Sequence, residues 1–301
     1  VPLSLFNLNQ KDDFGVFEIG MDKKGEIDYL SKIIKPDVGV ITNISYAHAK
    51  NFKNIKQIAL AKSEIIHNIK DGGAIVLNAD DQFYDFHKKI ALKKKLNIYT
   101  FSIKKQKSNI KLHSIKKEGI KYKVFININN QKKYFYSSSN FENNIMNILA
   151  TLAVIVIFKD VNKLSKNIFY KHHIPKGRGD ISKIKINKKN IYLIDESYNS
   201  NPLSLNSAIK NFDMIKVVNS KKHLILGDML ELGKHSKKLH MGISKIINRT
   251  AINNVNVIGK HITKTYKDIS KGKKGIILKN NFEIINLIKN NINNNDYLMI
   301  K

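Results

Sequence analysis

The sequence predicts an α/β protein with two domains: a mostly parallel sheet with an antiparallel edge, followed by a Rossmann-like, doubly wound domain. Three observations support this fold class. Short β-branched runs alternate with amphipathic helical stretches near the start of the chain, and the same alternation returns in its last part. Between these parts, residues 97–138 contain strand-like segments of alternating apolar and polar residues. A loop at Pro175–Gly179 marks the boundary, which we place so that the domains are residues 1–181 and 182–301.

The first domain is expected to begin with strands and helices in turn. An apolar run at residues 15–19 reads as the opening strand, and helical spacing at 27–34 is stopped by Pro36. The later elements are a buried strand at 38–44, a helix at 56–69, a strand at 74–77, strands at 110–115, 122–128 and 133–137, and a helix at 144–158. The last three strands should form the antiparallel edge of the sheet.

The second domain repeats a strand-helix unit several times. Helical stretches at 203–215 and 236–247 separate strand-like runs, and there is no GxGxxG sequence. The predicted strands are residues 191–194, 223–226, 255–258, 275–278 and 297–300. The pattern therefore resembles dinucleotide-binding folds without carrying their fingerprint.

The composition excludes several classes of protein. No cysteine is present, which removes disulfides, thiolate catalysis and cysteine-ligated zinc. No apolar run approaches the roughly 20 residues that span a bilayer, so we expect a cytoplasmic protein with no membrane insertion. The net charge of +29 fits a polyanion partner. The lysines are scattered, however, and Arg178 and Arg249 are the only arginines, which favours compositional drift over specific nucleic-acid binding.

Three groups in the first domain could carry chemistry. Glu18 ends the apolar run at residues 15–19, a place where phosphate-transferring enzymes hold magnesium, although such an acid is often only a solvated strand end. His48 follows the next strand. Lys62 lies four residues after Ile58 on a helix, at the border of its apolar face, so it need not point fully into solvent.

A family resemblance joins these groups. The order FEIG…KPDVGVITNISYAHAKNF…ALAKSEII…VLNADD resembles the central ATPase domain of the Mur ligases. The resemblance implies that Glu18 and His48 are magnesium ligands. It also implies that Lys62 is carbamylated by CO2, which turns a cation into an anionic oxygen ligand for the second of two Mg2+ ions.

Nucleotide-binding residues are implied in the same way. Asn144 and Asn147 resemble an HNxxN segment that the family uses at the adenine, although asparagines at a helix start are commonly caps. Arg178 lies in a GRG turn whose arginine contacts the ATP phosphates in the family, and a guanidinium fork suits phosphate geometry.

Two segments of the second domain resemble family signatures. DESYNSNP matches DDSYNANP, with Glu196 in place of the commoner Asp, and GDMLELG with His240 beyond it matches a segment of the members that add D-alanyl-D-alanine. By this resemblance Asp195 or Glu196 acts on the ribose or phosphate. The implied substrate-binding residues are Tyr198, Asn199, Asn201, Asp228, Met229, Glu231 and Gly233. Asn201 and Pro202 also read as an ordinary helix start.

The family's GxxGKT phosphate loop does not occur in the 301 residues. The opening VPLSL resembles the segment that follows this loop, and the final strand stops where the family continues. We therefore expect a chain truncated at its N-terminus, so that its Mur-ligase ATPase domain is incomplete, and truncated also at its C-terminus, after the final strand. We expect that this chain does not turn over ATP by itself.

The resemblance implies an ATP-dependent ligase, a monomer, that joins D-alanyl-D-alanine to UDP-N-acetylmuramoyl-tripeptide through an acyl phosphate. Three alternatives stay open: another amino-acid ligase of the superfamily, a basic nucleic-acid-binding protein, and a non-catalytic remnant. The identity of the diamino acid in the tripeptide does not follow from the sequence.

Overall fold

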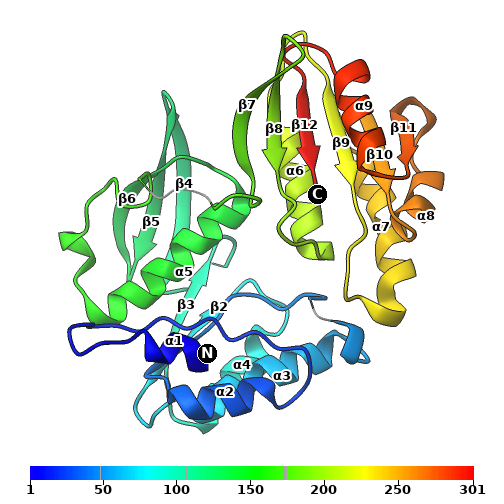
Figure 1. The fold of residues 1–301 in the computed structure, drawn as a ribbon. Coiled ribbons are helices and arrows are strands. Elements are labelled where there is room, and N and C mark those ends of the chain that lie inside the picture. Colours follow the sequence, from blue (N-terminus) through cyan, green and yellow to red (C-terminus); the bar gives the residue numbers. More distant parts are fainter. Residues whose placement is uncertain (48, 106, 172–174) are drawn as a thin grey trace. The chain divides into compact units, whose positions relative to one another are not determined.

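The computed structural model of the protein describes residues 1–47, 49–105, 107–171 and 175–301 (Figure 1). Its chain divides into two compact units. The first unit is Val1–Ile44 with Asn51–His172, and the second is Ser45–Lys50 with His173–Lys301. Each unit is built around its own six-stranded sheet.

The sheet of the first unit follows the order of the chain. Its first four strands are parallel and its last two are antiparallel, which confirms the mostly parallel sheet with an antiparallel edge. The strands, in spatial order, are β1 (Val38–Ile41), β2 (Ala74–Asn78), β3 (Asn97–Ser102), β4 (Ile110–Glu118), β5 (Lys121–Ile128) and β6 (Gln131–Ser137).

Helices cover the sheet of the first unit. Every residue of β2 is buried, as expected for a parallel strand with both faces covered. The helices are α1 (Pro2–Phe6), α2 (Glu26–Ile34), α3 (Ile55–Asn68), α4 (Tyr84–Lys93) and α5 (Glu142–Phe158), with a short 3-10 turn at η2 (Val161–Lys163). Another 3-10 turn, η1 (Ala49–Asn51), lies where the chain passes from the second unit back to the first.

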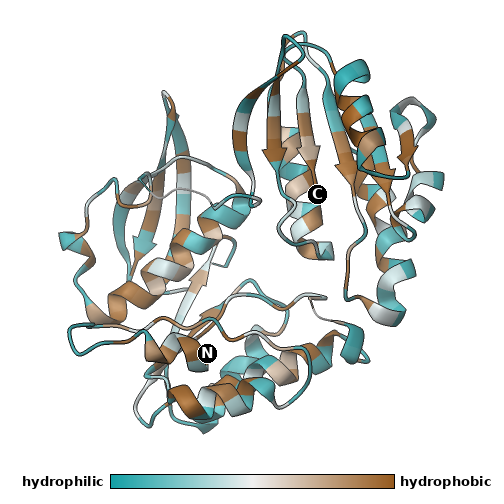
Figure 2. Cartoon of the chain, viewed as in Figure 1, coloured by the Kyte–Doolittle hydropathy of each residue, from teal (hydrophilic) through white to brown (hydrophobic). Residues whose placement is uncertain are grey.

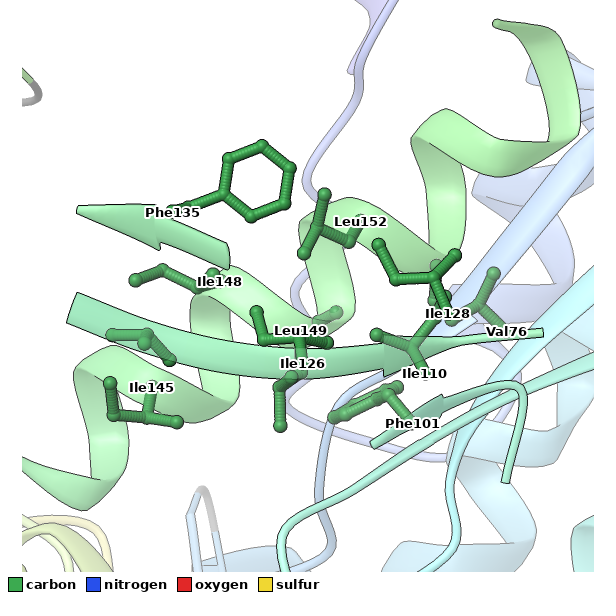
Figure 3. Close-up of a cluster of buried hydrophobic side chains, with 13 residues drawn as sticks. Val76, Phe101, Ile110, Ile126, Ile128, Phe135, Ile145, Ile148, Leu149 and Leu152 are labelled. Carbon is green, nitrogen blue, oxygen red and sulfur yellow. The ribbon is translucent and has the colours of Figure 1, made fainter. Parts of the chain in front are cut away.

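The core of the first unit forms between α5 and one face of the sheet. Leu149 and Leu152 of α5 are fully buried against Phe101 of β3 and Ile126 of β5 (Figure 3). Since side chains alternate along a strand, Ile75 of β2 must point to the opposite face from the core residue Val76. Two faces of one sheet are thus packed by different helices.

The expected opening strand at residues 15–19 is wrong. This segment has no regular structure, and Val16 is 95% exposed. A strand exists only where a neighbour accepts and donates its backbone hydrogen bonds, and β1 begins the described sheet with β2 as its partner. Glu18 therefore lies on an exposed segment and not at a strand end.

The second unit has a doubly wound sheet, as predicted. Five strands are parallel, and β7 pairs antiparallel to β8 at one edge. The strands are β7 (Asp180–Ile186), β8 (Lys189–Asp195), β9 (Lys222–Leu226), β10 (Asn254–Ile258), β11 (Lys274–Leu278) and β12 (Tyr297–Ile300), in the spatial order β11-β10-β9-β12-β8-β7. The helices are α6 (Pro202–Met214), α7 (Ser236–Asn248), α8 (Ile262–Lys267) and α9 (Asn281–Asn291), with 3-10 turns at η3 (Gly233–His235) and η4 (Lys271–Lys273).

The position of β12 in the sheet determines which strand ends lie side by side in this unit. β12 is the last strand in the chain, yet it pairs with β8 on one side and β9 on the other. Leu298 of β12 is buried with Ile225 of β9, Ile191 of β8 and Leu287 of α9. The carboxyl ends of these three parallel strands therefore meet at one edge, where open α/β sheets bind ligands.

Hydrophobic residues concentrate along the strands and on α5 (Figure 2). None of the helices in the described part of the chain combines the length and apolar character that a membrane crossing requires.

Candidate functional site

Lys62 in the first unit points toward the sheet. It lies on α3, whose residues Ile58, Ala61 and Ile66 are fully buried, and it is itself partly buried. Its Nζ donates to the carbonyl oxygen of Asn43 at 3.1 Å. Burial lowers the pKa of Lys62, and the nearby negative charge of Asp81 opposes this effect. A larger share of the amine is therefore neutral, and so nucleophilic, than for a lysine in water.

Two aspartates that follow β2 shape the surroundings of Lys62. Asp81 accepts hydrogen bonds from the backbone N–H groups of Ile44 (2.7 Å) and Phe83 (2.8 Å), so it joins the ends of β1 and β2. Burial raises the pKa of Asp80, but hydrogen bonds led by that from Ser102 outweigh it and hold this pKa below the usual range. We did not assign Asp80 or Asp81 to the site from the sequence, although acids directly after a buried strand were the available signal.

The expected metal ligands are only partly placed. Among the described residues Glu18 has no hydrogen-bonding or ionic partner, and His48 lies outside the described residues. The described ranges hold no cluster of three or more His, Asp or Glu side chains able to bind a metal. An ammonium group is no ligand for Mg2+, so Lys62 fits such a site only as a carbamate, whose oxygens are the hard donors that Mg2+ prefers.

Asn144 and Asn147 lie near the start of α5 but have different surroundings. The Nδ2 of Asn144 donates to Ser137 Oγ (2.9 Å) and to the carbonyl oxygen of Ser139 (3.3 Å), which ties the helix to the end of β6. Asn147 is exposed. Neither caps α5, since its N-cap residue is Phe141.

In the second unit two family-like turns form one hydrogen-bonded structure. The N–H of Gly179 donates to the carbonyl oxygen of Asp195 (2.7 Å), and the N–H of Tyr198 donates to that of Gly177 (3.1 Å). The Arg178 guanidinium lies 4.5 Å from the centre of the Tyr198 ring. This stack presents a cation and an exposed aromatic ring together at the carboxyl end of β8.

Both glycines of this turn are required by its geometry. Gly177 has φ +77° and Gly179 has φ +95°, which most other residues avoid. A Cβ on Gly179 would lie 2.7 Å from Glu196 Oε1, and one on Gly177 would lie 3.0 Å from the Tyr198 Cβ. The GRG sequence is therefore explained by close approach to the second turn.

The other acids and asparagines of this segment divide into engaged and exposed side chains. Asp195 Oδ1 accepts from the Ser197 N–H (3.0 Å) and hydroxyl (2.6 Å). Asn199 is exposed. Asn201 caps α6: its Oδ1 accepts from the N–H groups of Leu203 and Ser204 in a capping box. The side-chain oxygen of Asn201 is therefore engaged as a helix cap, as the alternative of an ordinary helix start predicted.

The GDMLELG segment is held by a buried histidine and by its own aspartate. His240 accepts the Met229 N–H at Nε2 (2.9 Å), so its proton is on Nδ1, which donates to the Ser236 carbonyl oxygen (2.7 Å). Burial lowers the pKa of His240. The Asp228 carboxylate accepts from three consecutive backbone N–H groups at residues 260–262. Asp228 therefore joins the ends of β9 and β10.

The remaining residues of the GDMLELG segment differ in exposure and backbone conformation. Met229 is buried, Glu231 is exposed and has φ +59°, and Gly233 has φ +52° at the start of η3. Of the residues expected to contact substrate, Tyr198, Asn199 and Glu231 have exposed side chains, and the side chains of Asn201, Asp228 and Met229 are partly or fully buried.

Comparison with protein families gives two matches. A model of the Mur ligase middle domain matches residues 1–155, and a model of the Mur ligase, glutamate ligase domain matches residues 182–301. Two similar proteins are UDP-N-acetylmuramoyl-tripeptide–D-alanyl-D-alanine ligases from Buchnera aphidicola subspecies. The ligase from Buchnera aphidicola subsp. Acyrthosiphon pisum is 34% identical, and the match covers 94% of this chain. The ligase from Buchnera aphidicola subsp. Baizongia pistaciae is 32% identical, and the match covers 100% of this chain. The chain spans 62% and 63% of the length of these relatives.

Solved structures share the fold. MurF from Acinetobacter baumannii matches 99% of the chain with a TM-score of 0.85 at 24% identity, and the chain spans 64% of it. MurF from Thermotoga maritima in complex with ADP matches 100% with a TM-score of 0.82 at 23% identity, and the chain spans 66% of it. Since the middle-domain model alone matches residues 1–155 of 301 and the second model matches most of the rest, the chain belongs to the Mur ligase family.

Proposed function

We propose that this chain forms part of an ATP-dependent ligase that joins D-alanyl-D-alanine to UDP-N-acetylmuramoyl-tripeptide in cell-wall precursor synthesis. One observation carries the proposal. The turns at Gly177–Gly179 and Asp195–Asn199 interlock, and together they present Arg178 and Tyr198 at a strand-end edge. Family membership and the names of its relatives support the choice of substrates.

Several residues are proposed to contact the nucleotide. Arg178 suits the ATP phosphates, because its guanidinium offers paired donors to phosphate oxygens. Asn144 and Asn147 would contact the adenine, although the Nδ2 of Asn144 is already engaged in this structure. Asp195 or Glu196 would act at the ribose or phosphate. The ADP-bound relative supports a nucleotide in this fold.

Lys62 is proposed to react with CO2. Its neutral amine attacks the carbon, a C–N bond forms, one C=O π bond moves onto oxygen, and the nitrogen releases a proton. The product is a carboxylate that would hold Mg2+ with Glu18 and His48. The lowered pKa of Lys62 supports this reaction, since only the neutral amine is a nucleophile. Two Mg2+ ions, when bound, would offset phosphate charge during transfer.

The proposed reaction has two steps. A carboxylate oxygen of the tripeptide attacks the γ-phosphorus of ATP, and ADP leaves. The amine of D-alanyl-D-alanine then attacks the acyl carbon, phosphate leaves, and the nitrogen loses a proton. Tyr198, Asn199, Asn201 and residues 228–233 would shape the substrate site. The backbone there is preorganised, since His240 and Asp228 hold the GDMLELG segment through hydrogen bonds.

An acceptor screen tests the proposal. The gene product that carries these 301 residues is incubated with MgATP and UDP-N-acetylmuramoyl-tripeptide, and product formation is measured by mass spectrometry. We expect amide formation with D-alanyl-D-alanine and none with single amino acids. Turnover only with a single amino acid, or with glutamate and folate, would identify another ligase of the superfamily. For the 301 residues alone we expect no ATP turnover, because they contain no GxxGKT sequence.

A further inference from the structure

Lys301 is a buried cation in the second unit that the sequence did not mark as a site residue. It follows β12 and is 8% exposed. Its Nζ donates to Glu196 Oε2 (3.2 Å), to the Glu196 carbonyl oxygen (3.2 Å) and to the Asn199 carbonyl oxygen (2.8 Å). All three N–H groups of the ammonium thus have an acceptor in the turn after β8.

A second cation, Arg178, lies in the turn whose Gly179 faces the same carboxylate. Arg178 precedes Gly179, on which a Cβ would lie 2.7 Å from Glu196 Oε1. Burial lowers the pKa of Lys301, and the positive charge of Arg178 adds a smaller lowering, while Glu196 opposes both. Within the described ranges Arg178 nevertheless forms no ion pair, and its guanidinium stacks on Tyr198. Two cations therefore share this corner with Glu196, whose carboxylate is paired with the lysine. The other acids of the two turns are engaged elsewhere: Asp180 accepts from the Gly177 N–H, and Asp195 accepts from Ser197.

The pairing of Glu196 with Lys301, and not with Arg178, has a chemical consequence. An arginine beside an unpaired carboxylate forms a planar, bidentate pair, which is the stronger arrangement for a guanidinium. Were Glu196 not already paired, Arg178 would be drawn from the Tyr198 ring and neutralised. A neutralised guanidinium cannot bind a second anion with the same donors.

We propose that Lys301 is a positioning residue that neutralises Glu196 and thereby keeps the Arg178 guanidinium free for an anionic phosphate group. The identity of that phosphate, as part of ATP, rests on the proposed function. The competition between Lys301 and Arg178 for Glu196 does not, because it concerns only residues of this chain.

The two arginines make the competition measurable without a ligand. In a chain labelled with 15N-arginine, Arg178 and Arg249 give the only Nε–H signals, and R249K assigns them. We expect K301M to move the Arg178 signal and to slow its exchange with water, as pairing with Glu196 requires. The double variant K301M/E196Q should return the signal to its original position. E196Q alone should leave it in place.

Nucleotide affinity provides the second readout. Titration with ADP should show binding weakened about 10-fold in K301M, as for the loss of a charge-assisted hydrogen bond, and restored in K301M/E196Q to within about 3-fold of E196Q. Lys222 is a matched control. It is 3% exposed in the same unit, and its Nζ donates to a carbonyl oxygen with no carboxylate partner, so K222M should change neither readout.

The outcomes separate the two proposals. An Arg178 signal that is unchanged in K301M overturns the positioning role, as does a loss of affinity that E196Q fails to restore. If the unsubstituted chain does not bind ADP, the nucleotide part of the proposed function fails for this chain, and the arginine signal still decides the competition. Should K301M not fold by circular dichroism, K301Q is read in the same way, since it keeps amide donors and lacks the charge.

Discussion

Two lysines, one in each unit, show how different the fate of a buried ammonium can be. Burial lowers the pKa of both Lys62 and Lys301. Among the described residues, the Nζ of Lys62 donates to one acceptor, a backbone carbonyl oxygen at 3.1 Å. Lys301 has three acceptors, one of them a carboxylate. Burial alone therefore does not assign a role: a lysine with few partners is suited to react, and a fully partnered lysine is suited to hold structure.

The fold explains the difference. Lys62 lies on a helix and donates to the backbone that follows β1, and the charge of Asp81 opposes the lowering of its pKa by burial. Lys301 follows a strand inserted between β8 and β9, so its side chain enters the turn that ends β8. The Nζ of Lys301 thus meets three acceptors of the turn after β8, whereas the described acceptor of Lys62 is one carbonyl oxygen of the segment after β1.

The largest expected effect is on stability. Lys301→Met leaves the partly buried Glu196 carboxylate and two carbonyls without their donor, and should lower the free energy of unfolding of the second unit by about 3 kcal/mol. Lys62→Met removes one hydrogen bond and also the cost of burying a charge, so the first unit should change by less than about 1 kcal/mol. Hydrogen exchange of β8 and β12 peptides against β1 and β2 peptides measures the two units separately. Equal losses in both units would contradict the comparison.

A smaller effect is expected at the glycine beside Glu196. Gly179→Ala places a Cβ 2.7 Å from Glu196 Oε1 at φ +95°, and should cost about 2 kcal/mol while weakening the Lys301 pair. Gly25→Ala is the matched control in the first unit, because Gly25 has φ +91° and open space around it. It should cost only the backbone strain, about 1 kcal/mol. Urea denaturation followed by hydrogen exchange measures both, and a larger loss for Gly25→Ala would argue against contact with Glu196.

Acid should destabilise both units through one buried histidine each. Burial lowers the pKa of His87 and of His240 below the unfolded value of about 6.5. Below that pH the unfolded chain binds protons that the folded chain does not. Stability is therefore complete above about pH 6.5 and is lost as the pH falls toward the folded pKa, by at most about 1.4 kcal/mol per pH unit for each histidine. His87→Gln should flatten the slope of the first unit only, and His240→Gln that of the second; an unchanged slope in both would show that other groups control it.

The smallest expected signal is the carbamate itself. With 13C-bicarbonate, followed by alkylation and peptide mass spectrometry, we expect a minor labelled fraction at Lys62 that grows as the pH rises from about 7 to 9, because more amine is neutral. Lys301 should stay unlabelled, since its three N–H groups are all engaged. Label on Lys301 and none on Lys62 would reverse the comparison.

Several features of this protein could be predicted from local sequence. The β-branched runs and amphipathic stretches predicted most strands of both sheets and the helices α2, α3, α5, α6 and α7, because each depends on residues a few positions apart. The GRG and DESYNSNP sequences indicated turns, and family resemblance indicated their chemistry. The structure adds that Asn201 acts as a helix cap and that Asp228 joins two strand ends.

Other features depended on distant parts of the chain. Residues 15–19 have the composition of a strand, but no strand in the described part of the chain pairs with them. β7 was missed because its hairpin with β8 turns at Asn187 and Lys188, both with positive φ, instead of at the usual Asn-Gly.

The sequence by itself determined the fold class, the family and the turns that carry its signatures. Only the tertiary structure decided that Lys301 has three acceptors and that Lys62 has one acceptor within the described ranges. Lys301 and Glu196 are 105 residues apart in the chain, and they meet because β12 inserts between β8 and β9. Such a contact leaves no local pattern, since sheet order is set by the packing of whole strands and helices.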